Sequence, residues 1–345
     1  RGLGDVYKRQ ELMHTADGNA AAQLGMKLGY DADFAKMREK LLSNGLREIV
    51  TATSQTLAED DARGRKELKC DTPSPEPGCS LTLRYLYQVL RGLPPEAVFA
   101  QIVLGFELAS SDPRFVGLNL VMPEDWYVPT HDFNEHMAMM DYLHGVYPKV
   151  HITLHAGELA MGLVKPEDLS YHIRASVERG HAERIGHGVS VMLEKDPIGL
   201  MKEMAERNVL VEINLTSNDQ ILGVTGDDHP LPIYMKYGVP VAISTDDEGV
   251  ARSDMTHEYL RAVQGYHLSY AELKRMTRDS LEHSFLPGKS LWATTKPTFR
   301  LAAPCATSTP DKPAYSCVGE FLAENERARE QWKLEAAFAA FEKKF

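Results

Sequence analysis

The stretch Lys149–Glu158, which reads KVHITLHAGE, decides how this sequence folds. Its alternation of apolar and polar residues is typical of a β-strand with two distinct faces. We expect one face, with Val150, Ile152 and Leu154, to pack against helices. The other face, with His151, Thr153 and His155, is expected to point into a barrel. Ala156 and Gly157 then form a small turn that lets the carboxylate of Glu158 fold back beside the imidazole of His155.

The same arrangement recurs along the chain. Short Val-, Ile- and Leu-rich runs predict strands at Gln101–Glu107, Phe115–Val121, Lys149–His155, Glu183–His187, Val209–Leu215 and Pro240–Asp246. Helical patterns fall at His131–Tyr147, Pro166–Arg179, Pro197–Arg207 and His257–His283. Polar residues at four successive strand ends, Glu158, His187, Asn218 and Asp247, are separated by 29, 31 and 29 residues. This βα period predicts a parallel sheet with crossover helices.

Upstream, Glu11–Thr15 is predicted as an earlier strand, followed by a helix at Asp33–Ser43 and a helical insertion over about residues 46–98. The strand count is then seven, so we expect an α/β chain of the (β/α)8 TIM-type barrel class that lacks its first strand. A doubly wound open sheet is the competing architecture, but the sequence contains neither GxGxxG nor GxxxxGK[ST].

The predicted barrel covers residues 11–285, and residues 286–345 form a Pro-rich segment and a C-terminal helix at Glu320–Lys344. That helix is expected to dock through Phe321, Leu334, Phe338 and Phe341. Residues 1–10 (RGLGDVYKRQ) resemble the translation of a sequencing-library adapter rather than native protein. We therefore expect the natural protein to begin upstream and to be longer.

Composition excludes several function classes. The 345 residues carry a net charge of −11 with 43% hydrophobic residues, and no basic stripe or long apolar run is present. We therefore expect neither nucleic acid nor a membrane as a partner, but a small-molecule substrate. A homodimer is left open.

The four cysteines form two local pairs in turn-rich sequence, Cys70 with Cys79 and Cys305 with Cys317. This spacing favours two disulfides over a metal site, and hence a periplasmic or secreted protein. Four reduced thiols in a cytoplasmic protein are the alternative.

The predicted strand ends carry the residue types of a metal-assisted hydrolase. Each residue alone is unspecific, because a lone strand-end His is usually structural and an Asp-Asp pair usually caps a helix. Together at one barrel mouth, His155 and Asp246 are candidate metal ligands, Glu158 a candidate acid, and His187 and Asp247 candidate orienting groups.

Four motifs, in this order, resemble those of the adenosine deaminase-like hydrolases of the amidohydrolase type. They are His155–Glu158 (HAGE), Arg184–Gly188 (RIGHG), Glu212–Asn218 (EINLTSN) and Ser244–Asp247 (STDD). The cysteine-bearing insertion and the run Leu120–Asp125 (LVMPED) look more like the secreted, growth-factor-related branch of that family.

The resemblance implies zinc-dependent conversion of adenosine and water to inosine and ammonia. It implies that His155 and Asp246 bind Zn²⁺, that Glu158 protonates the purine N1, and that His187 orients and deprotonates the attacking water. It further implies that Gly157, Asp247 and Asp125 contact the substrate, with Asp247 near N7 of the base.

This sequence departs from the family pattern at the first strand, which in the family carries a His-x-His pair. His14 does not supply such a pair, so two further ligands are expected upstream, and this chain is expected to bind zinc weakly. Met122 stands where cytosolic members have Gly, and Glu248 where Pro is usual. Deamination of adenine, methylthioadenosine or aminodeoxyfutalosine, and a catalytically silent purine-binding protein, remain alternatives.

Overall fold

The computed structural model describes residues 8–12, 15–81 and 83–345. Residues 1–7 of the adapter-like segment, and His14, lie outside them. Seven parallel strands follow one another in chain order: β1 (Lys8–Leu12), β2 (Leu83–Leu90), β3 (Phe115–Val121), β4 (Thr153–Ala156), β5 (Arg184–His187), β6 (Leu210–Ile213) and β7 (Val241–Ile243). A bridge between Leu118 and Ile152 joins β3 to β4.

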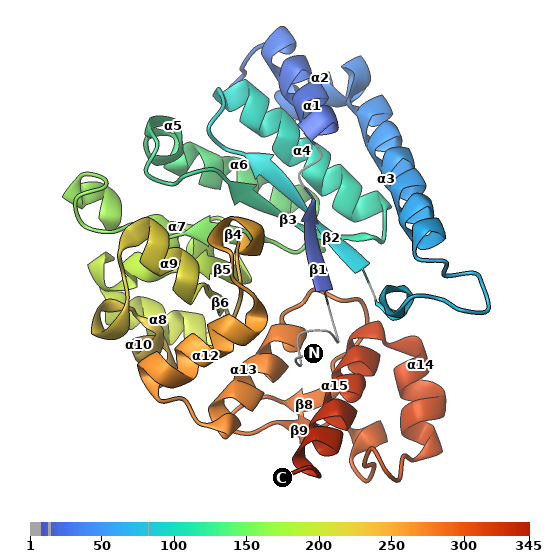
Figure 1. Cartoon of the computed structure of the whole chain (residues 1–345). Coiled ribbons are helices and arrows are strands. Elements are labelled where there is room, and N and C mark those ends of the chain that lie inside the picture. Colours follow the sequence, from blue (N-terminus) through green and yellow to red (C-terminus); the bar gives the residue numbers. More distant parts are fainter. Residues whose placement is uncertain (1–7, 13–14, 82) are drawn as a thin grey trace.

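Helices cover the outside of these strands, while the C-terminal segment lies at one end of them (Figure 1). In the first half of the chain they are α1 (Thr15–Leu28), α2 (Phe34–Leu41), α3 (Arg47–Glu67), α4 (Pro95–Ser111), α5 (Tyr127–His131), α6 (Phe133–Val146) and α7 (His172–Glu178). In the second half they are α8 (Pro197–Glu206), α9 (Leu215–Leu222), α10 (Leu231–Lys236), α11 (Glu248–Ala251), α12 (Met255–Tyr266), α13 (Tyr270–Glu282), α14 (Leu322–Glu324) and α15 (Glu326–Glu342).

The strand order confirms the parallel α/β class. Pairing runs β1-β2-β3 and β4-β5-β6-β7 without the reversal that a doubly wound sheet requires. Each strand is followed by at least one helix, as in a (β/α)8 barrel. Among the described residues no pairing joins β7 to β1, so the barrel is open between them.

The prediction of a strand at Gln101–Glu107 is wrong, because these residues lie within α4. Nearly every residue of α4 from Ala97 to Leu108 is buried, so the helix has no polar face to reveal its period. A short apolar run of this kind fits a buried strand and a buried helix equally well.

The strand that takes this place in the barrel is β2, which lies inside the segment predicted as a helical insertion over residues 46–98. It pairs with β1 on one side and β3 on the other. The helical part of that segment is α3, and the parallel strands among the described residues still number seven, β1 to β7. The predicted strand at Glu11–Thr15 is shifted: β1 ends at Leu12, and α1 begins at Thr15.

The predicted helix His257–His283 is two helices. His267 ends α12 in the left-handed region (φ +54°), and Ser269 begins α13 with a capping box. The side chain of Ser269 accepts the backbone N–H of Glu272, whose carboxylate accepts the backbone N–H of Ser269. The break separates the helix that borders the site, α12, from the one that packs under α15.

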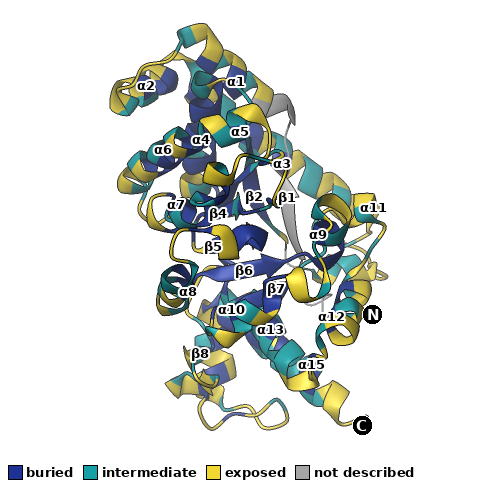
Figure 2. Ribbon diagram, turned by 90° about the vertical axis from the view of Figure 1, so that its left-hand side faces the viewer, coloured by how far each residue is buried: buried dark blue, intermediate teal, exposed yellow. Residues whose placement is uncertain are grey.

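The core lies between the strands and the helices that surround them (Figure 2). Strands β5, β6 and β7 are buried along their whole length. This burial on both faces fits a parallel sheet wrapped by helices, and it gives the polar residues at the strand ends a rigid base.

The C-terminal segment packs on the barrel through α15, where Leu334 and Phe338 form a buried cluster with Leu281 of α13. Of the other two residues predicted to dock this helix, Phe321 is partly buried and Phe341 is 40% exposed. Both predicted disulfides are present: Cys70–Cys79 follows α3, and Cys305–Cys317 is fully buried.

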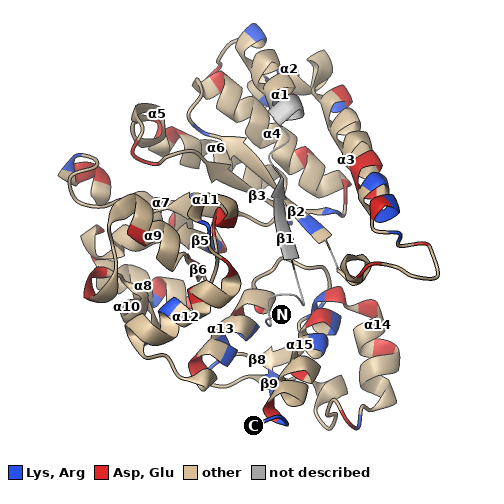
Figure 3. Cartoon of the chain, in the orientation of Figure 1, with Lys and Arg blue, Asp and Glu red and all other residues tan. Residues whose placement is uncertain are grey.

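Acidic and basic residues are interspersed along α3 and α15 (Figure 3). Within the part of the chain that the structure describes, none of the helices has the length and apolar character needed to cross a membrane.

Candidate metal and catalytic site

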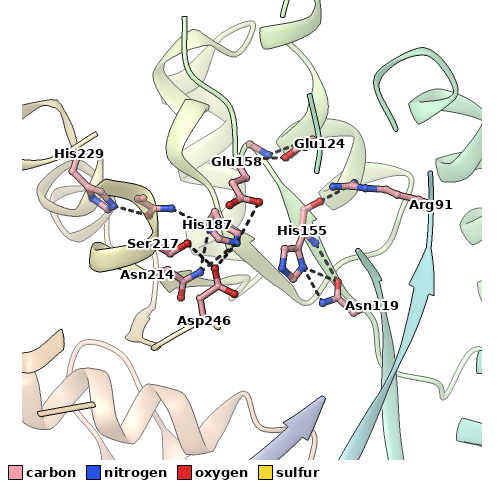
Figure 4. Close-up of polar contacts among 12 residues, drawn as sticks. Arg91, Asn119, Glu124, His155, Glu158, His187, Asn214, Ser217, His229 and Asp246 are labelled. Carbon is pink, nitrogen blue, oxygen red and sulfur yellow. Dashed lines mark hydrogen bonds and ion pairs between the residues drawn. The ribbon is translucent and has the colours of Figure 1, made fainter. Parts of the chain in front are cut away.

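Four side chains from the carboxyl ends of β4, β5 and β7 converge on one point (Figure 4). They are His155, Glu158, His187 and Asp246. The carboxyl ends of parallel strands meet at one mouth of a barrel, and active sites form there. The site is therefore a direct product of the βα period.

His155 is the third residue of β4 and is held by one residue of β3 and one that follows β2. Its ring Nδ1 lies 2.9 Å from the amide nitrogen of Asn119 on β3, and its backbone N–H donates to the same side chain. The guanidinium of Arg91, which follows β2, donates to the carbonyl of His155 over 3.1 Å. These contacts fix the direction in which the imidazole points.

The turn after β4 is fastened by a buried carboxylate. Glu124 accepts the backbone N–H groups of Gly157 and Glu158 over 3.0 and 2.8 Å. Gly157 has φ +73°, and a Cβ there would lie 2.6 Å from Ile173. Only glycine tolerates both the positive φ and the lack of space for a Cβ at this position. With glycine here the turn folds back, and Glu158 lies near the imidazoles.

Glu124 is itself held as an anion. Burial opposes its charge, but the hydrogen bond and charge of His172, together with the nearby charge of Arg91, lower the pKa of Glu124 to about 2. The Nδ1 atom of His172 lies 2.5 Å from this carboxylate. A buried, fully ionised carboxylate is a strong acceptor for two backbone N–H groups.

Glu158 has the opposite environment. Burial, and the negative charges of Asp246 and Glu124, raise the pKa of Glu158 to about 7, although His155 and Arg91 oppose the shift. A carboxylic acid with this pKa carries a proton at neutral pH for part of the time. It can therefore act as a general acid where an ordinary glutamate cannot.

His187 lies at the centre of the cluster and its side chain is 1% exposed. Its Nε2 atom is 3.7 Å from an oxygen of Glu158 and 3.7 Å from one of Asp246. Ser217 donates to the same oxygen of Asp246 over 2.7 Å. Both His187 and Asp246 have left-handed backbone (φ +69° and +53°), a conformation that is uncommon for residues other than glycine.

Two imidazoles and one carboxylate form a set of potential metal donors. One ligand atom each from His155, His187 and Asp246 can be chosen so that all lie within 4.8 Å of one another. Imidazole nitrogens and carboxylate oxygens are donors of the kind that Zn²⁺ takes in proteins. The residues present therefore fit a divalent metal ion.

Two predicted substrate residues do not join this cluster. Asp247 is exposed, and no side-chain contact links it to the cluster within residues 83–345. Asp125 is also exposed, whereas its neighbour Glu124 is buried and supports the site. Asn218, predicted at a strand end, lies in α9, because β6 ends at Ile213.

Sequence reasoning missed the residues that support the cluster. They are Arg91, Asn119, Glu124, His172, Asn214, Ser217 and His229. Asn214 and Ser217 belong to a motif that the sequence singled out, so their position after a strand was an available signal. His172 begins α7 and His229 precedes α10, and no repeating pattern of apolar and polar residues in the sequence points to either of them.

Solved structures with the same fold include two deaminases. The adenine deaminase from Arthrobacter aurescens matches with a TM-score of 0.50 and 16% identity, over 81% of this chain and 94% of that one. The N6-methyl-AMP deaminase from Arabidopsis thaliana matches with a TM-score of 0.50 and 19% identity, over 83% and 95%. These similarities establish the shared fold.

Comparison of sequences finds a higher identity over a shorter region. Adenosine deaminase from Escherichia coli strain SMS-3-5 is 39% identical over 137 residues, which is 39% of this chain and 38% of that enzyme. The aligned region thus covers less than half of that relative. The sequence profile described as adenosine deaminase matches residues 71–293, which is well over half of the chain and includes every residue of the cluster. The chain belongs to the adenosine deaminase family.

Proposed function

We propose that this protein hydrolytically deaminates adenosine, or a closely related 6-aminopurine nucleoside, producing inosine and ammonia from adenosine. The observation that carries the proposal is Glu158. It is a largely buried carboxyl group with a pKa of about 7, next to the donor set of His155, His187 and Asp246. Deamination needs a proton donor to the ring beside a site that can hold the attacking water.

In this proposal His155 and Asp246 hold a zinc ion. Bound zinc would lower the pKa of a water molecule and so supply a nucleophile near neutral pH. Glu158 donates its proton to ring nitrogen N1 of the purine, and His187 orients the attacking water. Gly157, Asp125 and Asp247 are proposed to contact the substrate.

Replacing Glu158 tests the proposal. Formation of inosine is followed by the change in absorbance at zinc concentrations that saturate the chain, with zinc binding measured in parallel. Glu158→Gln keeps the size of the side chain but cannot donate an acidic proton, so kcat should fall by about 100-fold or more. Its backbone hydrogen bond to Glu124 stays in place.

Glu183→Gln is the matched control. Glu183 precedes β5 at the far end of the barrel, where it pairs with His151 and is 49% exposed. The same chemical change there should leave turnover close to that of the parent chain. Failure of the zinc-saturated parent chain to form inosine contradicts the proposed activity, and equal turnover by Glu158→Gln contradicts the role of Glu158.

The choice of purine is tested by a panel of substrates. The two structural relatives with a TM-score of 0.50 are named for adenine and N6-methyl-AMP, so both compounds belong in the panel with adenosine and methylthioadenosine. We expect the highest kcat/KM for adenosine. Tight binding of a purine nucleoside without turnover of any member would favour a catalytically silent binding protein.

We also propose that the protein works in an oxidising compartment, as members of a secreted branch of the family would. The two disulfides, Cys70–Cys79 and Cys305–Cys317, support this proposal. Thiol titration of denatured protein, recovered from its natural source and alkylated on lysis, should find no free thiol. Four free thiols would contradict the proposed compartment.

A further inference from the structure

His187 is contacted on its two ring nitrogens by groups of different kinds. Its Nε2 atom faces the carboxylates of Glu158 and Asp246 at 3.7 Å, which is too long for direct hydrogen bonds and leaves room for a third group. Its Nδ1 atom lies 2.9 Å from the amide nitrogen of Asn218. The position of the ring proton therefore depends on which way the amide of Asn218 points.

A second histidine determines the orientation of that amide. The backbone N–H of Leu231 donates to Nδ1 of His229 over 3.1 Å. A backbone N–H can only donate, so Nδ1 of His229 must be the unprotonated nitrogen. In neutral His229 the proton is then on Nε2, which lies 3.1 Å from the side-chain oxygen of Asn218.

The chain of hydrogen bonds thus has only one consistent direction. Nε2–H of His229 donates to the oxygen of Asn218, and the amide N–H of Asn218 donates to Nδ1 of His187. The amide nitrogen of Asn214 lies 3.3 Å from the same Nδ1 atom and 3.5 Å from Nε2. With Nδ1 accepting, the proton of neutral His187 lies on Nε2.

We propose that His229 and Asn218 form a one-directional relay that holds His187 in the tautomer with its proton on Nε2, pointing at Glu158 and Asp246. His229 and Asn218 are therefore positioning residues. For its catalytic meaning this inference rests on the proposed deaminase function. His187 then acts on the attacking water as a hydrogen-bond donor that orients it, rather than as the proton acceptor that family resemblance implies.

Burial protects the hydrogen bonds of the relay from competition by water. Asn218 is 0% exposed, and His187 and His229 are each 1% exposed, so water does not compete for these bonds. Burial lowers the pKa of His229 to about 4, which keeps the ring neutral at physiological pH. The relay also spans separate elements, since it links the end of β5 to α9 and to the residues that precede α10 (Figure 4).

The tautomer can be measured without turnover. Metal-free protein labelled with ¹⁵N-histidine is examined by NMR at pH 8, and the resonances of His187 are assigned by their loss in His187→Gln. We expect an unprotonated, pyridine-type Nδ1 and a protonated, pyrrole-type Nε2. The reverse pattern in the parent chain would overturn the inference.

Asn218→Asp reverses the polarity of the relay. A carboxylate can only accept, so the proton of His187 should move to Nδ1 and the two resonance types should exchange. The matched control is Asn208→Asp, which makes the same change beside His283 at the other end of the barrel, where Asn208 contacts Nε2 of that ring. It should leave His187 unchanged, and an unchanged pattern in Asn218→Asp would contradict the relay.

His229 is tested with two variants. Gln retains an amide donor that can reach Asn218, so His229→Gln should keep the tautomer, whereas His229→Leu should give a mixture of the two forms. With adenosine, Asn218→Asp and His229→Leu should lower kcat about 10- to 100-fold while KM stays close to that of the parent chain, and His229→Gln should recover most of the rate. Absence of turnover in the parent chain contradicts the proposed function alone, because NMR still decides the relay.

Discussion

At the scale of single residues, the cluster combines backbone conformations that are unfavourable for non-glycine residues with carboxylates that lie close to one another. His187 and Asp246 are held at positive φ, and the carboxylates of Asp246 and Glu158 both face one buried imidazole. Such positions cost stability and persist because function requires them. Substitutions at the residues of the cluster should therefore lower activity and raise the free energy of unfolding.

Asp246→Asn provides a direct test. The change removes one of the two negative charges, and asparagine tolerates left-handed backbone, so the metal-free protein should gain about 1 kcal/mol in its free energy of unfolding. Urea unfolding in the presence of a chelator measures the gain. Asp247→Asn removes the same charge from the exposed neighbour and should change stability by much less. A loss of stability in Asp246→Asn would contradict the argument.

His136 predicts how stability depends on pH. It is fully buried in α6, neither ring nitrogen has a hydrogen-bond partner among the described residues, and burial lowers its pKa to about 4. The unfolded chain, with a pKa near 6.5, binds protons that the folded chain does not, so this group destabilises the fold as pH falls from about 6.5 toward 4. The loss at pH 5 relative to pH 8 is about 2 kcal/mol.

His136→Leu should remove that loss. The variant should be at least as stable as the parent at pH 8, because no hydrogen bond is broken within the described part of the chain, and about 2 kcal/mol less sensitive to pH 5. Chemical unfolding at both pH values gives the difference. His144→Leu, at a half-buried position in the same helix, is the control and should retain most of the pH dependence. Equal pH dependence in parent and His136→Leu would exclude His136 as its source.

At this scale the sequence predicts the residues of the cluster but not the residues that support them. His155, Glu158, His187 and Asp246 were predicted because they terminate strands, and the structure brings them together. The supporting Glu124 and His229 were not, because their roles depend on contacts across 34 and 11 residues that no local pattern encodes. The sequence predicts a substrate contact at Asp125, whereas the buried carboxylate that supports the cluster is Glu124, one residue earlier in the same loop.

At the scale of elements, the sequence was informative where polar residues mark the end of a short apolar run. The strands from β3 to β7 were predicted within a few residues, since polar residues mark their ends. In contrast, α4 is buried on all faces and was taken for a strand, and β2 was hidden in a segment that begins with the polar helix α3. The break between α12 and α13 carried a readable signal, the capping box that starts at Ser269.

The docking of α15 gives a prediction at this scale. Phe338 is fully buried against Leu281, so Phe338→Ala should lower the free energy of unfolding by about 3–5 kcal/mol. Phe341, three residues further along the helix, is 40% exposed and contacts the rings of Tyr270 and Phe345. Phe341→Ala should therefore cost less than about 1 kcal/mol. Equal losses in thermal or urea unfolding would show that α15 is docked by another face.

At the scale of the whole molecule, the α/β class and the strand order followed from the 30-residue period. The C-terminal segment did not, because it packs through contacts that are distant in sequence. Arg278 of α13 makes a double hydrogen bond with Glu335 of α15, and Arg84 at the start of β2 pairs with Glu326 at the start of α15. Only the assembled fold reveals that the last helix closes on a strand near the first.

This pairing has a consequence for the ribosome-bound chain. Glu326 is translated 242 residues after Arg84, which at about 5–20 residues per second leaves the start of β2 without this partner for roughly 10–50 s. Leu281 of α13, which α15 also covers, is translated shortly before α15 and stays exposed for a shorter time. Chaperone demand in the cell should therefore be set by the time needed to synthesise the final helix rather than by the folding rate of the finished chain.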